Sequence, residues 1–95
     1  MIIWVTGRRG AGKTTLAREL CQKMDALNLD GDDMRASITG ELGYTAKDRM
    51  TNNIKIAKLA KVLEEQGIDV IVSTICPEYV RQQVKHISKC KFIHL

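Results

Sequence analysis

The fold is decided by residues 2–16, which read IIWVTGRRGAGKTTL. The first four are β-branched or aromatic, and such an unbroken apolar run is typical of a strand buried on both faces of a parallel sheet. Glycines then punctuate residues 7–12, and from Lys13 to Met24 apolar residues recur at helical spacing. The sequence therefore predicts a strand, a glycine-rich loop and a helix in direct succession.

The glycine-rich loop has the spacing G-x-x-x-x-G-K-T, from Gly7 to Thr14. Glycines allow the backbone to wrap tightly and turn its N–H groups inward, forming an anion-binding nest at the positive end of the following helix. Lys13 is expected to reach the β- and γ-phosphates of ATP, and the Thr14 hydroxyl is expected to coordinate Mg²⁺. A glycine-rich turn with an incidental lysine is the alternative, which the flanking strand and helix disfavour. The residues expected to bind the nucleotide are Gly7, Gly10, Ala11, Gly12, Lys13, Thr14 and Thr15.

Beyond the first helix, short apolar runs alternate with helical stripes. Strands are expected over residues 26–29, 69–75 and 91–95, and helices over 34–38, 46–66 and 78–88. Thr45 is the expected N-cap of the long helix, and Gly67 its stop. This alternation predicts βαβ units, and therefore a parallel sheet with right-handed crossovers.

Composition excludes several classes of protein. The chain has 95 residues, 44% hydrophobic and 27% charged, which fits one folded domain. Its longest apolar run, Met1–Val5, is far shorter than the roughly 18 residues of a membrane span, so no membrane partner is expected. A net charge of +4 favours anionic partners, but four aromatic residues are too few for the stacking surfaces of single-stranded nucleic acid readers. Three cysteines without a CxxC pattern predict reduced thiols in the cytoplasm.

An acidic stretch, LDGDDMR over residues 29–35, follows the second predicted strand. Open α/β sheets bind their ligands at the carboxyl ends of strands, where a carboxylate can hold Mg²⁺ or accept a hydroxyl proton. Arg35, one helical turn further on, could clamp an anionic acceptor. The alternative is structural, with Asp32 and Asp33 capping the short helix. From these residues alone the two interpretations are even.

Residues 43–52, GYTAKDRMTN, bring an aromatic ring, an arginine and an amide to the start of the long helix. Arg49 and Asn52 are three residues apart and therefore share a helix face, which would suit a binding surface. The alternative is that Asp48 caps the helix beside a solvated arginine.

Taken together, these motifs resemble those of the adenylylsulfate kinase family in order and spacing. The resemblance rests on the phosphate loop, on LDGDDMR, on LGYT with Asp48, Arg49 and Asn52, and on Ile75-Cys76-Pro77 after the third predicted strand. It implies an α/β fold of P-loop NTPase type, a three-layer αβα core with a parallel sheet of about four strands. It also implies an ATP- and Mg²⁺-dependent kinase that phosphorylates the 3′-hydroxyl of adenylylsulfate to give 3′-phosphoadenylylsulfate.

The resemblance also assigns roles to single residues. Asp32 is implicated in Mg²⁺ binding, with Thr14, and in catalysis, with Lys13. The residues implied to bind the nucleotide substrate are Arg35, Tyr44, Arg49, Asn52 and Ile75, with the Tyr44 ring packing on the substrate adenine. Related kinases of another small hydroxyl acceptor or of polynucleotide 5′-hydroxyls, and a nucleotide-binding module without catalysis, are the competing interpretations.

Several positions depart from the family pattern. Cys76 stands where the family commonly has serine, so a phosphoserine intermediate is not expected, and a small buried thiol is. Arg8 and Arg9 replace small or apolar residues, and they either reinforce phosphate binding or are solvated charges. The family continues past the fourth strand with a basic lid. Residues 1–95 are therefore expected to be one incomplete P-loop kinase domain that binds nucleotide weakly, transfers little phosphate and exposes an edge strand through which it could form a homo-oligomer.

Overall fold

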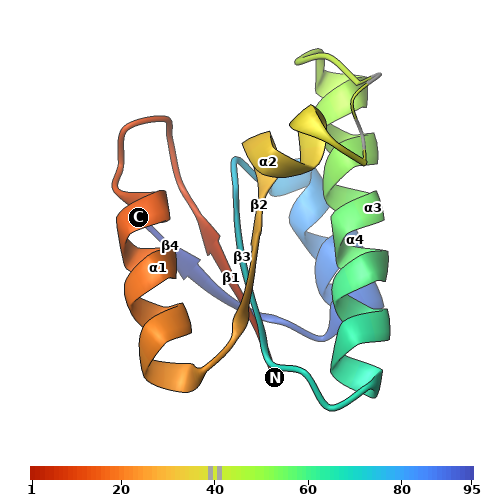
Figure 1. The fold of residues 1–95 in the computed structure, drawn as a ribbon. Coiled ribbons are helices and arrows are strands. Elements are labelled where there is room, and N and C mark those ends of the chain that lie inside the picture. The colour runs from red at the N-terminus through yellow and green to blue at the C-terminus, as the bar shows by residue number, and fades with distance from the viewer. Residues whose placement is uncertain (39, 41) are drawn as a thin grey trace.

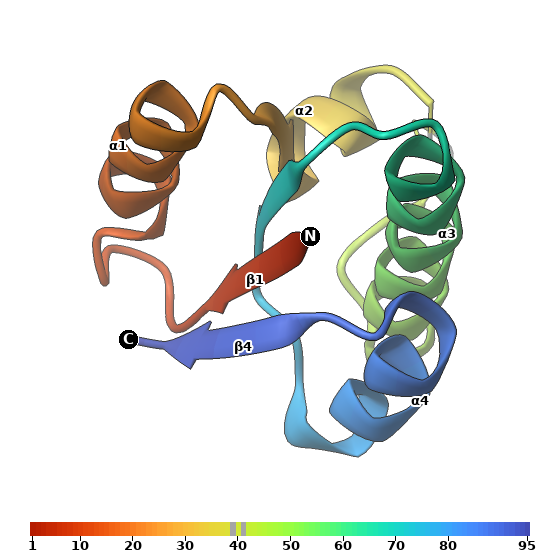
Figure 2. The same ribbon diagram turned by 90° about the horizontal axis from the view of Figure 1, so that it is seen from below.

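Four parallel strands form the central layer of the computed structural model, which describes residues 1–38, 40 and 42–95. The strands are β1 (Ile2–Thr6), β2 (Leu27–Asp30), β3 (Val70–Thr74) and β4 (Lys91–His94), in the spatial order β2-β3-β1-β4. The helices are α1 (Lys13–Met24), α2 (Gly31–Ala36), α3 (Ala46–Glu65) and α4 (Glu78–Ser88). α1 covers one face of the sheet, and α3 and α4 cover the other (Figures 1 and 2). The predicted three-layer αβα architecture is confirmed.

The chain reverses its winding between β1 and β3, the two central strands. From β1 it passes through α1 to β2 on one side, whereas β3 leads through α4 back to β4 on the other side (Figure 2). The register places Thr6 level with Thr74, and Asp30 level with Ser73. Because all the strands are parallel, their polar carboxyl ends meet at one edge of the sheet, where α/β proteins bind their ligands.

Alternating residues of the strands fill two separate cores. Ile2, Trp4, Val70 and Val72 pack against α3 and α4, in one cluster with Ile56, Ala57, Ala60, Val80 and Val84. On the other face Val5 and Ile71 pack against Ala17 of α1. β1 and β3 are therefore buried on both faces, as their unbroken apolar runs predict. No helix in the described part of the chain is long and apolar enough to cross a membrane.

The short helix α2 begins earlier than predicted. Residues 34–38 were expected to be helical, with Asp32 and Asp33 as caps, but the helix spans Gly31–Ala36. The reason is Asp30, whose Oδ1 accepts hydrogen bonds from the backbone N–H groups of Asp32 (2.9 Å) and Asp33 (3.2 Å). This N-cap lets the helix start directly at the end of β2 without an intervening turn.

The long helix α3 forms as predicted. Thr45 Oγ1 accepts a hydrogen bond from the N–H of Asp48 at 3.1 Å, and Gly67 has a φ of +84° just beyond the helix end. The Asp48 carboxylate in turn accepts from the N–H of Gly43 at 3.0 Å, so it fixes the turn that leads into the helix. Asp48 therefore has a structural role at the start of the helix, which was the alternative interpretation of this residue from the sequence.

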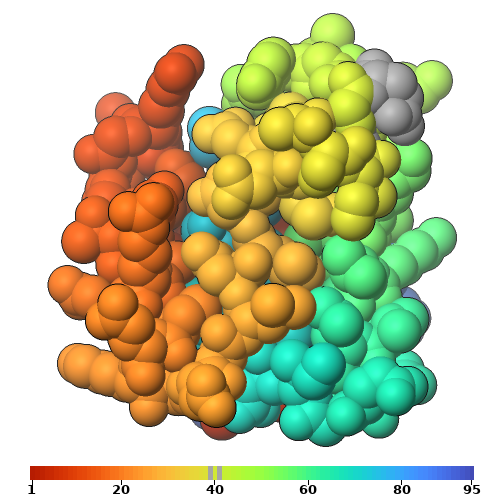
Figure 3. Space-filling view, viewed as in Figure 1, coloured from red at the N-terminus to blue at the C-terminus, as the bar shows by residue number. Residues whose placement is uncertain are grey.

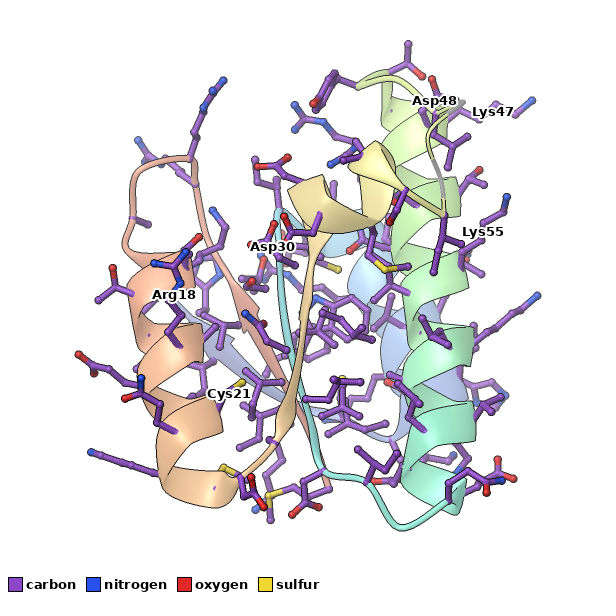
Figure 4. The ribbon with its side chains drawn as sticks, viewed as in Figure 1. Arg18, Cys21, Asp30, Lys47, Asp48 and Lys55 are labelled. Carbon is purple, nitrogen blue, oxygen red and sulfur yellow. The ribbon has the colours of Figure 1, made fainter. Side chains whose placement is uncertain are left out.

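The three cysteines are free thiols in different surroundings. Cys76 and Cys90 are buried, and burial raises the pKa of Cys76 from 9.0 to about 12, whereas Cys21 is half-buried on α1 (Figure 4).

Because the thiolate is the species that reacts with alkylating reagents, iodoacetamide should modify Cys21 first. Raising the pH from 7 to 9 should speed labelling of Cys21 and leave Cys76 unmodified until urea unfolds the protein. Peptide mass spectrometry measures this, and equal rates at Cys21 and Cys76 would contradict the prediction.

Candidate active site

A cleft of about 350 Å³ opens at the carboxyl edge of the sheet, between the phosphate loop on one side and α2 with the start of α3 on the other (Figure 3). Its lining residues come from four separate segments of the chain: Arg9, Gly10, Lys13, Thr14, Asp30, Gly31, Asp32, Arg35, Tyr44, Arg49, Ser73, Thr74 and Ile75. Such a volume lies at the lower end of the range for small-molecule sites. The motifs singled out in the sequence thus meet in one cleft.

The phosphate loop has a backbone that only glycine adopts readily. Gly10 and Gly12 have φ values of +83° and +93°, and Gly12 ends the loop as the N-cap of α1. Glycine has no side chain with which to cap the helix, so the N–H groups of the first turn of α1 are available to an anion. The Lys13 side chain lies over the loop, and its Nζ donates a hydrogen bond to the carbonyl oxygen of Arg8 at 2.8 Å.

Two carboxylates line the cleft, and they differ in hydrogen bonding and in exposure. Asp30 lies at the end of β2 (Figure 4), where its Oδ1 caps α2 and its Oδ2 accepts a hydrogen bond from Ser73 Oγ at 3.0 Å. Asp32 is 84% exposed, and its Oδ1 lies 3.7 Å from Nη1 of Arg35, whose side chain is 14% exposed. At this distance, and with the carboxylate in water, the ion pair has little strength. Asp30 is therefore committed to the fold, whereas Asp32 is accessible to a ligand.

The side of the cleft that is formed by α2 and the start of α3 also groups two arginines around an aromatic ring. The guanidinium of Arg35 stacks over the Tyr44 ring, with Cζ 4.6 Å from the ring centroid. Arg49 Nε donates to the carbonyl oxygen of Tyr44 at 3.1 Å. Tyr44 is nevertheless 64% exposed, and it lines the cleft. Cations beside an accessible aromatic ring suit an anionic ligand that carries a planar base.

Some predicted site residues do not line the cleft. Asn52 is fully buried, and Gly7 is buried at the end of β1. Ala11, Gly12 and Thr15 belong to the loop and the first turn of α1 but lie outside the lining. The Ala11 N–H donates to the Arg8 carbonyl at 3.1 Å, whereas the N–H groups of Gly12 and Thr15 can still face an anion. Nucleotide binding by the loop stays a prediction, as does substrate binding by Asn52.

A buried polar network beneath the cleft was not predicted from the sequence. Trp4 Nε1 donates to Thr74 Oγ1 at 2.9 Å, and this hydroxyl donates to Asn53 Oδ1 at 2.7 Å. Asn53 Nδ2 donates to the carbonyl oxygens of Ile75 (3.1 Å) and Arg49 (2.8 Å). One amide therefore ties the end of β3 to the turn of α3 that carries Arg49. The sequence signal was an asparagine at a position where helical spacing brings residues to the core.

Replacing Asn53 with alanine should destabilise the fold strongly. The change leaves buried polar groups of Thr74 and Ile75 without their partner, which costs about 3 kcal/mol. For a chain of this size the melting temperature should fall by roughly 12–24 °C. Thr51→Ala is the control, because its hydroxyl makes one bond on the same helix, to the Lys47 carbonyl, and its loss should cost less than about 0.5 kcal/mol. Equal melting temperatures of the two variants would show that the network contributes little.

A magnesium ion fits the donor set of the cleft. Thr14 and Asp32 lie in the same lining, so a hydroxyl and an accessible carboxylate face one space. Among the described residues no group of three or more His, Cys, Asp or Glu could hold a metal by itself. Mg²⁺ typically binds to one or two carboxylates together with substrate phosphates, and it does not need a cage of protein ligands.

Comparison with known protein families assigns the chain to one of them. The family model for adenylylsulphate kinase matches residues 1–95. The chain belongs to the adenylylsulfate kinase family. The predicted family is thereby confirmed, and its members are kinases of P-loop NTPase fold.

Two curated relatives that are similar to this chain have different names. The adenylyl-sulfate kinase of Pseudomonas aeruginosa is 47% identical over 81 residues, which are 80% of this chain and 41% of the relative. The cytidine diphosphoramidate kinase of Campylobacter jejuni is 40% identical over 95 residues, 90% of this chain and 55% of the relative. The chain thus spans about half the length of the curated relatives that it matches.

A solved structure extends the likeness to three dimensions. The adenylylsulfate kinase of Mycobacterium tuberculosis, in complex with AMPPNP and APS, is 27% identical and superposes with a TM-score of 0.84. The match covers 98% of this chain and 59% of that protein. The fold therefore agrees over nearly the whole chain with that of an enzyme that binds an ATP analogue and adenylylsulfate.

Proposed function

We propose that this chain is the nucleotide-binding part of a kinase that transfers phosphate from ATP to the 3′-hydroxyl of adenylylsulfate, giving ADP and 3′-phosphoadenylylsulfate. The observation that carries the proposal is the shared cleft, in which a phosphate loop for the donor faces a cationic and aromatic surface for an acceptor nucleotide. Family membership supports the reaction type. The free thiols are in keeping with a reaction in the cytoplasm.

On the donor side, the loop would hold the triphosphate. The backbone N–H groups of Gly10 and of Gly12 to Thr15, together with the positive end of α1, would attract the α- and β-phosphates. Lys13 would exchange the Arg8 carbonyl for the β- and γ-phosphates, because a charged acceptor binds an ammonium more strongly than a carbonyl does. Thr14 and Asp32 would hold Mg²⁺, which when bound neutralises charge on the phosphates.

On the acceptor side, Arg35 and Arg49 would bind the anionic group of adenylylsulfate, and the Tyr44 ring would stack on its adenine. Ile75, at the end of β3, supplies apolar contact in the same cleft. This arrangement would place the ribose between the two halves of the site, with its 3′-hydroxyl toward the phosphate loop.

The transfer then requires little covalent chemistry from the protein. The 3′-oxygen forms a bond to the γ-phosphorus while the bond from that phosphorus to the β–γ bridging oxygen breaks, and ADP leaves with the electron pair. Asp32 would orient the hydroxyl or the metal, and the hydroxyl proton passes to a carboxylate or to water. Positioning and charge neutralisation supply most of the rate.

An acceptor panel tests the proposal. The protein is incubated with MgATP and, in separate reactions, with adenylylsulfate, AMP, a cytidine diphosphate and an oligonucleotide with a 5′-hydroxyl, and phosphorylated products are quantified by mass spectrometry. Acceptor affinity is measured alongside by calorimetry, so that binding preference and turnover are determined separately. We expect adenylylsulfate to be preferred in both measurements. The substrate assignment is wrong if neither measurement prefers it.

A second candidate acceptor has specific support. The Campylobacter jejuni relative, named for a cytidine nucleotide, aligns over 95 residues at 40% identity, so sequence similarity alone leaves the acceptor base open. Tyr44 could stack on a pyrimidine as well as on a purine, because every base has a π-face. Preference for the cytidine diphosphate in the panel would favour this second function.

A further inference from the structure

The two arginines of the phosphate loop occupy different positions. Arg9 lines the cleft, whereas Arg8 does not and contributes only its backbone carbonyl, which accepts the hydrogen bond from Lys13. Within the described residues, the guanidinium of Arg9 has no hydrogen-bond or ion-pair partner. The other two arginines of the cleft are engaged, Arg35 with Asp32 and the Tyr44 ring, and Arg49 with the Tyr44 carbonyl.

The position of Arg9 suits contact with the terminal phosphate of a bound triphosphate. The loop N–H groups and the α1 terminus attract the inner phosphates, so the chain of phosphates must extend from the loop toward the acceptor residues Tyr44 and Arg49. Of the loop residues before Lys13, only Arg9 and Gly10 line the same described cleft as those acceptor residues, and Gly10 has no side chain. Arg9 is therefore the residue of the loop before Lys13 whose side chain can bring a cation to the outer end of the phosphates.

The excess of positive charge in the cleft favours a ligand of high negative charge. Four cationic side chains, Arg9, Lys13, Arg35 and Arg49, line it together with the carboxylates of Asp30 and Asp32. Both oxygens of Asp30 accept hydrogen bonds within the fold. An unpaired guanidinium beside such a site favours a phosphate, which accepts two parallel N–H bonds from its planar fork.

We propose that Arg9 binds the terminal phosphate of the donor, so that the loop distinguishes a nucleoside triphosphate from a diphosphate. This inference rests on the proposed function only in taking the donor to be a nucleoside triphosphate. Arg8, one residue earlier and outside the cleft, has no such role.

The test compares the affinities of MgATP and MgADP by titration calorimetry in one buffer, for the wild type and for Arg9→Ala, Arg9→Lys and Arg8→Ala. Arg9→Ala should weaken MgATP binding about tenfold, the lower end of the range for a hydrogen bond to a charged group, and MgADP binding less than about twofold. Arg9→Lys should fall between the wild type and Arg9→Ala for MgATP. Arg8→Ala removes the same charge from the same loop and should change neither affinity by more than about twofold.

Three outcomes would overturn the inference. They are an unchanged MgATP affinity in Arg9→Ala, an equal loss for MgATP and MgADP, and an equal effect of Arg8→Ala, which would indicate net charge alone. A wild-type protein that binds neither nucleotide would overturn it as well. No acceptor is present in this measurement, so a failure of the adenylylsulfate assignment in the acceptor panel leaves the result on Arg9 unaffected.

Discussion

Replacing Lys13 with alanine should weaken MgATP binding by about 10- to 100-fold, the value of a hydrogen bond between charged groups. Among the residues that the structure describes, the Lys13 ammonium donates one hydrogen bond, to the Arg8 carbonyl, and Lys13 takes no part in either hydrophobic core. Its removal should therefore change the free energy of unfolding without ligand by less than about 0.5 kcal/mol. Thermal unfolding with and without MgATP measures both effects, because a ligand that binds the native state stabilises it.

The matched control is Lys23→Ala. Lys23 belongs to the same helix but lies exposed in its last turn, away from the cleft. Its substitution therefore removes the same charge without changing the loop. We expect MgATP to stabilise the Lys23 variant as much as the wild type. If MgATP stabilised the Lys13 variant to the same degree, Lys13 would not be a phosphate ligand.

Much of the fold could be predicted because its signals are local. The apolar run of β1, the glycines of the loop and the helical spacing of α1 are all contained in 23 consecutive residues, Ile2–Met24. The caps of α3 are equally local, with Thr45 and Asp48 three residues apart. Parallel pairing then follows from the βαβ alternation alone, and it brings the ends of β1, β2 and β3 to one edge.

The features that could not be predicted depend on contacts between distant segments. Asp30 and Ser73 are 43 positions apart, and their hydrogen bond becomes visible only when β2 lies beside β3. The same holds for Trp4, Thr74 and Asn53, whose side chains meet across up to 70 positions. A sequence pattern shows that Asn53 is polar, whereas only packing shows that every polar atom of its side chain is used. Arg8 and Arg9 are likewise equal in sequence, and the cleft distinguishes them.

Replacing Arg49 with alanine should weaken the binding of adenylylsulfate by about 10- to 100-fold and leave MgATP affinity within about twofold. The guanidinium lies in the cleft on the side away from the phosphate loop, at the start of α3, where it would pair with the anionic group of the acceptor. Donor and acceptor would thus use different segments of one cleft, so the two affinities should separate. Titration calorimetry with each ligand alone measures them.

Two further variants separate charge from structure at this position. Lys47→Ala removes a cation from the same turn of α3, but that side chain points away from the cleft (Figure 4), so both affinities should stay unchanged. Arg49→Lys keeps the charge and loses the planar fork that donates to the Tyr44 carbonyl, so adenylylsulfate affinity should be recovered only in part. A loss of MgATP affinity equal to the loss for adenylylsulfate in Arg49→Ala would instead mean that Arg49 holds the start of α3 in place, because a collapsed turn would disturb both halves of the cleft.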